Sequence, residues 1–478
     1  MNRTLADLRR TAREIFHDAL THMDAGEAVR RAVALDGGRL RIFDTEFALD
    51  SYPSIYSVAV GKAALPMAAA LGEILGDHLA GGVLSALMDD AERLARWQTF
   101  AGGHPLPNEA SLAAARAAFE LLRTADRRGA PIIFLISGGG SAMLEWPRVN
   151  ATTLAELREA NRMLVSCGAN IAEINAVRRA FSAVKGGGLS AHAPRAPQAT
   201  LIVSDTRADE PFNVASGLTM LAPTNAPDAA EVVARYRLDT RLPASILHAV
   251  NQSSETNTSK TSASETNTLA ADESVQDASP SATSSNTSTR RYYVLLDNEQ
   301  ALERAATAAR SRGFAVAIAH DLVEQPVAEG ASALVSRLVE MQERESSAMQ
   351  GVCLVSGGEF ACPVRGGGVG GRNTETVLRC AIEMDDRAAT SIQGQPSMVA
   401  LSAGTDGIDG NSPAAGALAD HTTLARARAR GLVARKFLAE SDAYSFFHAL
   451  GDALITGATG TNVRDLRIML ASKDEVRG

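Results

Sequence analysis

Paired cysteines are missing from this chain. The cysteines, four in 478 residues, stand far apart with no CxxC pair: Cys167, Cys353, Cys362 and Cys380. Disulfides and a cysteine-ligated metal therefore carry little weight, and free or buried thiols in a reducing compartment are expected.

Long apolar runs are also missing. No stretch is long enough to cross a membrane, and residues 1–16 lack the apolar core of a signal peptide. Asp7 and Glu14 argue against a transit peptide. The apolar spacing instead predicts an amphipathic helix whose buried face holds Leu5, Leu8, Ala12, Ile15, Phe16 and Ala19. We expect a cytoplasmic protein without a membrane partner.

Positive charge is not in excess, since the formal net charge is -8. Nucleic acid is therefore not expected as a general partner, although a local basic site for an anionic metabolite stays open. Two catalytic signatures are absent as well. There is no GxxxxGK[ST] phosphate loop, which excludes a Walker A site, and no GxSxG elbow, which argues against a nucleophilic serine.

What the sequence does contain is an alternation of short apolar runs with helical patterns. This alternation is typical of α/β proteins built from βαβ units around a parallel sheet, and the length predicts two domains. Strands are expected at 57–60, 82–86, 97–100, 131–136, 200–203, 292–296, 315–319, 352–355 and 398–401. Helices are expected from about Asn108, at 153–165, 171–184, 299–310 and 327–341, and from Glu375. In such sheets ligands bind beyond the carboxyl ends of the strands.

The stretch from Cys353 to Glu375 is the most informative. A buried strand is expected to break at Ser356, Gly357 and Gly358, with Glu359 directly after it. A second, nearly pure glycine break at 366–371 leads into Arg372 and Asn373 at the start of a helix. Glycines let backbone N–H groups approach an anion, and arginine offers a planar fork of donors. A phosphate site is favoured here over a flexible surface loop.

Two loops in the first half have a related character. Lys62 follows a strand and opens a helix, where it can act as a point charge on a phosphate or carboxylate; alone, such a lysine is more often a solvated surface residue. Ser137, Gly138, Gly139, Gly140 and Ser141 follow the clearest strand and offer hydroxyls and backbone donors. An anion nest and a simple tight turn are equally supported there.

Three aspartates stand in loops just after strands: Asp205, Asp406 and Asp409. Each could hold Mg²⁺, which takes one or two carboxylates together with phosphate oxygens. Capping or turn formation is the alternative for each, and the metal ligands stay unassigned. The polar run 456–462 offers a further set of donors, with a hairpin or turn as the alternative.

Residues 251–289 differ from the rest of the chain. They are mainly Ser, Thr, Asn, Glu and Ala, and the string SETNT occurs twice, at 254–258 and 264–268. Such a segment buries too little surface to offset its ordering entropy, so disorder is expected.

A dehydrogenase is the main rival to a phosphate-transfer enzyme. Gly366, Gly368 and Gly371 match GxGxxG. A dinucleotide site needs a strand running directly into the first glycine and an acidic residue after the next strand, and neither is apparent. The match is therefore read as an accident of glycine density.

Taken together, these motifs resemble the glycerate 2-kinase family, which joins an N-terminal glycerate-kinase domain (DUF4147) to a C-terminal MOFRL domain. In the first half the matching motifs are VAVGKAA at 58–64, GGHPLPNEAS at 102–111, LISGGGSAML at 135–144, INAVRRAFSAVKGGGLS at 174–190 and SDTRADEPFNVASGLT at 204–219. In the second half they are SGGE at 356–359, GGRN at 370–373, AGTDGIDG at 403–410 and TGATGTNVRDL at 456–466. The resemblance covers nearly the whole chain outside the Ser/Thr-rich segment.

The resemblance implies two α/β domains, the N-terminal one Rossmann-like with a mainly parallel sheet, and an active site in the interdomain cleft. The expected boundaries are 1–250 for the first domain, 251–290 for the insert and 291–478 for the MOFRL domain. The implied reaction is ATP-dependent phosphorylation of D-glycerate with Mg²⁺, most simply at the 2-hydroxyl. The lysine of the family's GKA motif matches Lys62 and the arginine of its GGRN motif matches Arg372, so these two are the expected catalytic residues. The polar residues around them would bind glycerate or ATP, and the division between the two ligands stays open.

Several positions depart from the family pattern. Thr374 replaces a glutamine, Leu218 and Ala458 replace prolines, and 207–210 replace a glycine-rich turn. These changes bear on substrate preference more than on reaction type. Phosphorylation to 3-phosphoglycerate, NAD(P)H-dependent hydroxypyruvate reduction and a catalytically silent metabolite-binding protein remain the alternatives, and a homodimer stays open.

Overall fold

The computed structural model describes residues 4–52, 54–87, 94–207, 210–265, 290–344, 351–390 and 397–472. These residues form two compact units, each interrupted in sequence. The Arg372 unit comprises 1–25, 203–209 and 296–478, and the Lys62 unit comprises 26–202 and 210–295. The two ends of the chain thus belong to one unit. The expected boundaries at residues 250 and 290 stay predictions.

The Lys62 unit is built on a six-stranded sheet in the order β6-β5-β4-β7-β8-β9. Its strands are β4 (Ile55–Val60), β5 (Leu79–Ala86), β6 (Trp97–Ala101), β7 (Ile132–Ser137), β8 (Gln198–Val203) and β9 (Arg290–Leu296). β4 pairs in parallel with β5 and β7, and β5 in parallel with β6. Every residue of β4, β7 and β8 is buried, as strands covered on both faces must be. The expected parallel sheet is confirmed.

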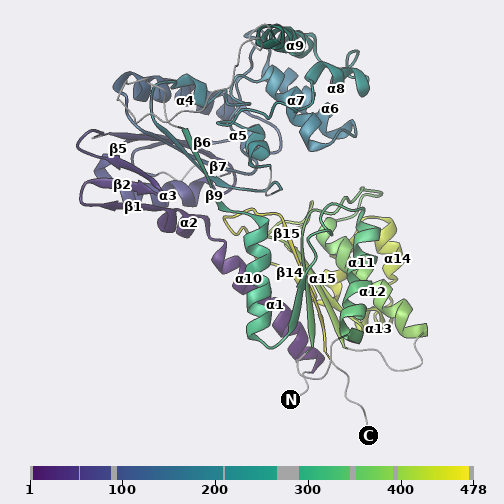
Figure 1. The fold of residues 1–478 in the computed structure, drawn as a ribbon. Coiled ribbons are helices and arrows are strands. Elements are labelled where there is room, and N and C mark those ends of the chain that lie inside the picture. Colours follow the sequence, from purple (N-terminus) through teal and green to yellow (C-terminus); the bar gives the residue numbers. More distant parts are fainter. Residues whose placement is uncertain are drawn as a thin grey trace, which may run out of the picture. The chain divides into compact units, whose positions relative to one another are not determined.

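Helices cover this sheet and extend beyond it (Figure 1). α4 (Glu109–Arg128) begins at a capping box made by Asn108 and packs on β4 and β5 through Ala115, Ala118 and Leu122. A second apolar cluster joins helices that stand apart from the sheet: α6 (Leu154–Ser166), α7 (Ile171–Phe181), α8 (Ala229–Arg235) and α9 (Ala244–Glu265). The other helices of the unit are α2 (Ala25–Ala32), α3 (Ala64–Leu75) and α5 (Gly140–Met143).

α9 includes the first part of the segment expected to be disordered. The helix is anchored where Ile246, Ala249 and Val250 are buried against α7 and α8, and it continues from there to Glu265. Disorder from Asn251 is therefore wrong for 251–265, because an anchored first turn lets a helix propagate into residues that could not nucleate one. The remainder, 266–289, lies outside the described residues.

A small antiparallel sheet in the Lys62 unit was not predicted from the sequence. It is formed by β1 (Val33–Asp36), β2 (Arg39–Ile42) and β3 (Thr45–Ala48). The β1–β2 turn uses Gly37 and Gly38, both with positive φ, as a two-residue hairpin requires. Strands of four residues with many charges give almost no periodic signal, which explains the omission.

The Arg372 unit has a mixed six-stranded sheet in the order β10-β11-β15-β12-β13-β14. The strands are β10 (Ala315–Ile318), β11 (Val352–Gly358), β12 (Met398–Gly404), β13 (Gly416–Asp420), β14 (Ala453–Leu454) and β15 (Asp465–Ala471). β10 and β11 are parallel, whereas β15 lies antiparallel between β11 and β12. The expectation of a βαβ parallel sheet is wrong for this unit, because a buried apolar run has the same sequence appearance in either direction.

Helices lie on both faces of the mixed sheet (Figure 1). α1 (Leu5–His22) and α10 (Asn298–Ser311) pack side by side on the face that carries Cys353, Val399 and Ile468. The opposite face is covered by α11 (Val327–Arg344), α12 (Arg372–Thr390), α13 (Thr423–Ala429), α14 (Ala434–Ala439) and α15 (Ala443–Leu450). The predicted apolar stripe of α1 is confirmed. None of the helices in the described ranges has the length and apolar character needed to cross a membrane.

Candidate active site

Arg372 is the first residue of α12 and the centre of an ionic cluster in its unit. Its Nε and Nη2 bind the two carboxylate oxygens of Asp465 at 2.6 and 3.0 Å, and Nη2 also lies 2.9 Å from Glu359 Oε1. Burial disfavours the charged guanidinium, but Asp465 and Glu359 outweigh it and raise the pKa of Arg372. Arg372 is thus a permanent cation held in one orientation by a bidentate fork.

The start of α12 is fixed by Asp409. Its carboxylate accepts hydrogen bonds from Asn373 N, Thr374 N and the Thr374 hydroxyl at 2.9, 2.8 and 2.7 Å. Desolvation raises the pKa of Asp409 despite these bonds. The aspartate caps the helix, so the capping alternative describes it better than metal ligation does.

Asn373 is buried beside Asp465. Its Nδ2 donates to Asp465 Oδ1 at 2.9 Å, while its Oδ1 accepts from the Ser402 hydroxyl at 2.5 Å. Asp465 therefore has donors from both Arg372 and Asn373, and the latter orients the carboxylate that orients the arginine. Ligand binding by Asn373 stays a prediction.

The expected strand break after Val355 is wrong, because β11 continues through Ser356, Gly357 and Gly358 in register with Asp465–Arg467. The reason is Arg467, a fully buried side chain that donates to the Ser356 hydroxyl at 2.9 Å, to the Gly358 carbonyl at 3.1 Å and to the Gly357 carbonyl. Its guanidinium lies 3.5 Å from the ring centre of Phe360. Burial lowers the pKa of Arg467 to about 10. Arg467 thus fixes Ser356, Gly357 and Gly358 at the end of β11, directly before Glu359.

Glu359 and Asp205 add negative charge next to Arg372. Desolvation raises the pKa of Glu359, and the charges of Asp465 and Asp205 add to that effect, against the opposing influence of Arg372 and Arg464. A divalent cation bound between neighbouring carboxylates relieves their mutual repulsion. Among the described residues, no group of three or more His, Cys, Asp or Glu side chains has a metal-ligand arrangement.

Asp406 lies in the turn after β12. Its Oδ1 accepts from Ile408 N at 3.1 Å, within the loop that ends in the capping Asp409. The carboxylate lies close to Gly404, where an added Cβ would be 3.1 Å from Asp406 Oδ1 and 3.7 Å from Asn373 Nδ2. Asp406 thus borders the cluster through its turn, while its role in binding stays a prediction.

Lys62 occupies the corresponding place in its own unit, just beyond the end of β4. Lys62 N donates to Gly138 O at 2.9 Å, and Ala63 N donates to the Ser137 hydroxyl at 3.0 Å. Gly61 has φ +121°, and a Cβ there would lie 2.3 Å from Ser137 Oγ. Only glycine lets the ends of β4 and β7 approach so closely. The predicted lysine and the predicted Ser/Gly loop are therefore brought together.

The Ser/Gly loop also positions side chains from elsewhere in the Lys62 unit. A Cβ at Gly139 would lie 3.1 Å from His104 Cδ2 and 3.2 Å from Lys62 Cγ, so both side chains lie over bare backbone. Gly140 opens the short helix α5, and the Ser141 hydroxyl lies 2.9 Å from that of Ser216.

Ser216 was not singled out from the sequence. Its hydroxyl donates to Asn175 Oδ1 at 2.8 Å, and both it and Ala215 adopt positive φ without being glycine. Strained backbone of this kind persists where the surroundings hold it, and it is frequent at functional sites.

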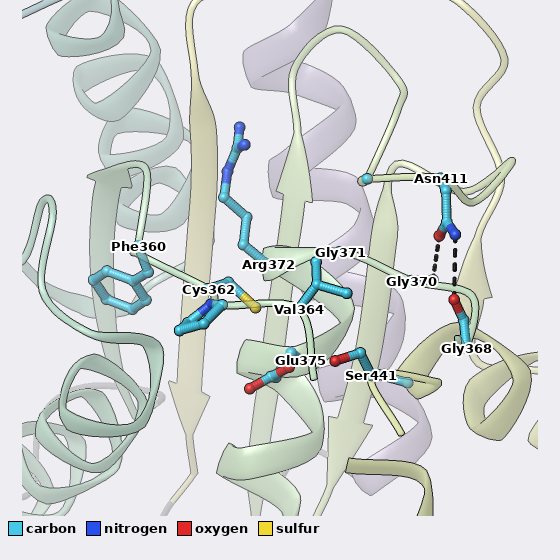
Figure 2. Close-up of a pocket in the computed structure, with 13 residues that line it drawn as sticks. Phe360, Cys362, Val364, Gly368, Gly370, Gly371, Arg372, Glu375, Asn411 and Ser441 are labelled. Atoms are coloured by element: carbon cyan, nitrogen blue, oxygen red, sulfur yellow. Dashed lines mark hydrogen bonds between the residues drawn. The ribbon is translucent and has the colours of Figure 1, made fainter. Parts of the chain in front are cut away.

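A pocket of about 420 Å³ opens beside Arg372, within the Arg372 unit (Figure 2). In Figure 2 the Arg372 guanidinium points away from Glu375, and Asn411 lies across Gly368 and Gly370. The pocket is lined by Phe360, Cys362, Pro363, Val364, Gly368, Gly370, Gly371, Arg372, Glu375, Gly410, Asn411, Ser441 and Ala443. In the described chain, residues 362–371 contain no strand, so the GxGxxG match lacks the strand that a dinucleotide site needs.

Comparison with known proteins now places the chain. The model of a domain of unknown function, DUF4147, matches residues 11–251, and the MOFRL family model matches residues 352–465. A glycerate kinase of Homo sapiens is 34% identical over 97% of this chain and 93% of its own length. The chain belongs to the glycerate 2-kinase family.

Other relatives agree with this membership. A D-glycerate 2-kinase of Thermotoga maritima is 30% identical over 86% of this chain and 89% of its own length. A crystal structure of a Thermotoga maritima glycerate kinase superposes with a TM-score of 0.75 at 27% identity, covering 97% of this chain and 99% of that chain. A protein of Agrobacterium vitis, 34% identical over 86% of both chains, carries hydroxypyruvate reductase only as a provisional name. Family membership makes this chain a kinase of two α/β domains.

Sequence reading missed the residues that hold Arg372 in place. Asp465 binds Arg372, and Arg467 holds Ser356, Gly357 and Gly358; both lie in β15, far along the chain from Arg372. The motif TGATGTNVRDL contained the aspartate, and a carboxylate at the first residue of a buried strand was the available signal. Pairing that carboxylate with Arg372 required the antiparallel insertion of β15.

Proposed function

We propose that this protein transfers the γ-phosphoryl group of ATP to the 2-hydroxyl of D-glycerate, giving 2-phosphoglycerate and ADP. The observation that carries the proposal is the geometry of Arg372, a cation fixed by Asp465 and Glu359 at the start of α12, in a chain of the glycerate 2-kinase family. A rigid arginine fork with remaining donors suits a phosphoryl group.

Phosphoryl transfer to a hydroxyl needs little covalent chemistry from the protein. In phosphoryl transfer the hydroxyl oxygen of the acceptor forms the new P–O bond and its proton is released to water, while the bond to the β-phosphate oxygen breaks and ADP leaves. The enzyme must hold both reactants and stabilise charge on the transferring oxygens. We assign charge stabilisation to Arg372. Lys62, a point charge beyond β4, is assigned to the glycerate carboxylate or to the same phosphoryl group.

Magnesium fits the acidic side of the cluster. Glu359 and Asp205 are the carboxylates proposed to hold it. Desolvation, with the charges of Asp465 and Asp205 added, raises the pKa of Glu359, and Mg²⁺ needs one or two carboxylates besides phosphate oxygens. The ion would neutralise charge on the nucleotide phosphates. Asp465 is less suited, since both of its oxygens already accept from Arg372 and one also accepts from Asn373.

The ligand-binding loops are part of the same proposal. Ser137–Ser141 are proposed to bind the anionic end of glycerate, because the side chains of Lys62 and His104 lie directly against Gly139 in this loop. Phosphorylation at the 3-hydroxyl is the alternative product. A reductase is not favoured, because Gly366–Gly371 follow no strand. The cytoplasmic location and the homodimer stay predictions, to be tested by cell fractionation and sedimentation velocity.

The deciding experiment is ADP release by the purified protein with Mg-ATP and D-glycerate, with the product position read by phosphorus NMR. Lys62→Ala and Arg372→Ala are compared with Lys436→Ala and Arg435→Ala, which remove exposed cations outside the proposed contacts. We expect glycerate-dependent ADP formation that is lost in the first two variants and kept in the controls. Oxidation of NADH with hydroxypyruvate and no ADP formation would instead establish the reductase.

A further inference from the structure

The pocket beside Arg372 has the size and lining of a small-molecule site. Its volume of about 420 Å³ falls in the range of roughly 300–1,000 Å³ that such sites occupy. Phe360, Pro363, Val364 and Ala443 supply an apolar wall, and Asn411 and Ser441 supply polar groups at its edge. A large apolar area with few polar groups suits a flat heteroaromatic ring better than it suits a small hydroxy acid.

The glycine-rich side of the pocket is held in place rather than loose. Gly368 N donates to Glu440 O at 3.0 Å and Val369 N to Asp442 Oδ1 at 2.9 Å. Asn411 fastens the loop from the other side, accepting from Gly370 N at 2.8 Å and donating to Gly368 O at 3.2 Å. A Cβ at Gly368 would lie 2.4 Å from Asp442 Cβ, so the loop needs glycine to pack this tightly. A ligand therefore meets a preformed wall and loses little affinity to ordering it.

Val364 is the unusual feature of this wall. Its side chain is 82% exposed, more than any other large apolar side chain in the described parts of the chain. It stands on a loop that is otherwise fixed, facing the pocket that it lines. A bound ring would remove this surface from water, which nothing in the described unit does.

The charges along the pocket run in one direction. Glu375 at the floor is paired with Arg379 at 2.7 Å and with Arg365 at 3.4 Å, so its charge is balanced within the protein. Arg372 stands at the opposite end with its guanidinium turned away from Glu375 (Figure 2). A ligand with an uncharged ring at one end and phosphates at the other would match this gradient.

We propose that this pocket binds the nucleoside end of the nucleotide, with the base against Val364 and Phe360 and the phosphates extending toward Arg372. The assignment rests on the proposed kinase function. It gives ADP or ATP to the Arg372 unit, and glycerate binds to residues outside this pocket. Arg372 is then the point at which nucleotide binding and phosphoryl transfer meet.

The test uses full-length protein and ADP as the probe, with binding measured by calorimetry. Val364→Asp places a negative charge on the apolar wall without disturbing the core, because the side chain is exposed. Cys362→Phe fills the pocket from its lining, with Cys362→Ser as its matched control. Val433→Asp is the control for the first variant: Val433 is 51% exposed, lies outside the pocket and occupies the N-cap of α14, where aspartate is favoured.

We expect the Kd for ADP and the KM for ATP to rise at least about tenfold in Val364→Asp and Cys362→Phe, with the KM for D-glycerate within about twofold of the parent. Both controls should match the parent protein. Parent-like ADP affinity in both pocket variants, with ADP release from ATP and glycerate intact, would overturn this inference and leave the kinase proposal standing. A parent protein that neither binds ADP nor forms it with glycerate would overturn both.

Discussion

Each of the two units pairs a cation with a buried carboxylate, and the exposure of the cation differs between the two pairs. In the Lys62 unit, Lys185 pairs with Glu145, and each side chain is 1% exposed. The Ser182 hydroxyl donates to Glu145 at 2.5 Å. In the Arg372 unit, Arg372 is 33% exposed while its partner Asp465 is 1% exposed. The first pair is sealed from any ligand, whereas the second presents one open side.

The pKa values follow the same division. Burial lowers the pKa of Lys185 although the charge of Glu145 favours the protonated amine, because burial disfavours the charged form more strongly. The pKa of Arg372 is raised, because its carboxylate partners outweigh its burial. Breaking a fully buried ion pair destabilises the fold, because the remaining charge is left buried without a partner. A partly exposed arginine keeps donors that a substrate can reach. We therefore expect mutations to divide into stability effects and activity effects.

The largest expected effect is on catalysis. Arg372→Lys keeps a positive charge but loses the bidentate fork to Asp465, so kcat for ADP release should fall about 10²–10³-fold while the midpoint of urea unfolding hardly moves. Arg435→Lys, at an exposed arginine that pairs with Asp386 at 3.0 Å, is the matched control. Parent-like turnover in Arg372→Lys would show that a point charge is enough and would remove the fork from the mechanism.

The sealed pair should show the opposite pattern. Lys185→Met leaves Glu145 buried without its cation, and the free energy of unfolding should drop by about 3–5 kcal/mol. The double variant Lys185→Met with Glu145→Leu should recover much of that loss. Kinetics at a temperature where each variant is folded should give near-normal kcat. A kcat loss that the double variant does not relieve would place Lys185 in the chemistry.

A third ionic cluster, of intermediate exposure, sharpens the comparison. Arg9 of α1 binds Asp420 and Asp452, and Arg426 lies 2.8 Å from Asp452. Arg9 is 17% exposed, so Arg9→Met should lower the free energy of unfolding by less than the sealed pair does, by about 1–2 kcal/mol.

The Arg9 cluster also predicts a pH dependence. Burial opposes the charged form of Asp420, but hydrogen bonds from Thr422 and the charge of Arg9 prevail, and the pKa of Asp420 is lowered from 3.8. Its contribution is present above that unfolded value and is lost as pH falls through the lower folded value. Urea unfolding at pH 2–6 should therefore show a smaller acid-induced loss of stability in Arg9→Met. Identical slopes in both proteins would contradict the assignment.

The smallest expected effect concerns Glu359. Its pKa is raised, so its favourable contribution is present below the unfolded value of 4.5 and is lost as pH rises through the folded value. Glu359→Gln should flatten this dependence, leaving the variant at least as stable as the parent at pH 7 without magnesium. Turnover should nevertheless fall if the carboxylate holds the metal. Measurement of unfolding from pH 4 to 8, with and without Mg²⁺, tests both statements.

The sequence predicted those elements whose signal is local. The fully buried strands β4, β7 and β8 appear in the sequence as continuous apolar runs, and Asn108 marks the start of α4 as its N-cap. The strand β15 was not predicted, because Asp465 and Arg467 interrupt its apolar run. The hairpin sheet was missed because its strands are short and charged.

For the site, the sequence identified the cations and not what holds them. Lys62 and Arg372 stood out by their glycine neighbours, but Asp465, Arg467 and Ser216 act through contacts between residues far apart in the chain. Such contacts are set by tertiary packing, which a single sequence does not encode in any local pattern. The role of Asp409 followed the capping alternative for the same reason, since only the fold shows where its oxygens point.

The central position of β15 has a consequence for synthesis of the chain. The ribosome releases α1, β11 and β12 before β15, yet β15 joins β11 to β12 in the finished sheet and α1 packs against it. In the nascent Arg372 unit, β11 and β12 therefore lack the strand between them until residues 465–471 emerge. The strands of the other sheet are complete by Leu296. A product of premature termination would lack Asp465, and Arg372 would have no anchor. Such fragments would be clients for chaperones and proteases, and only complete chains would turn over substrate.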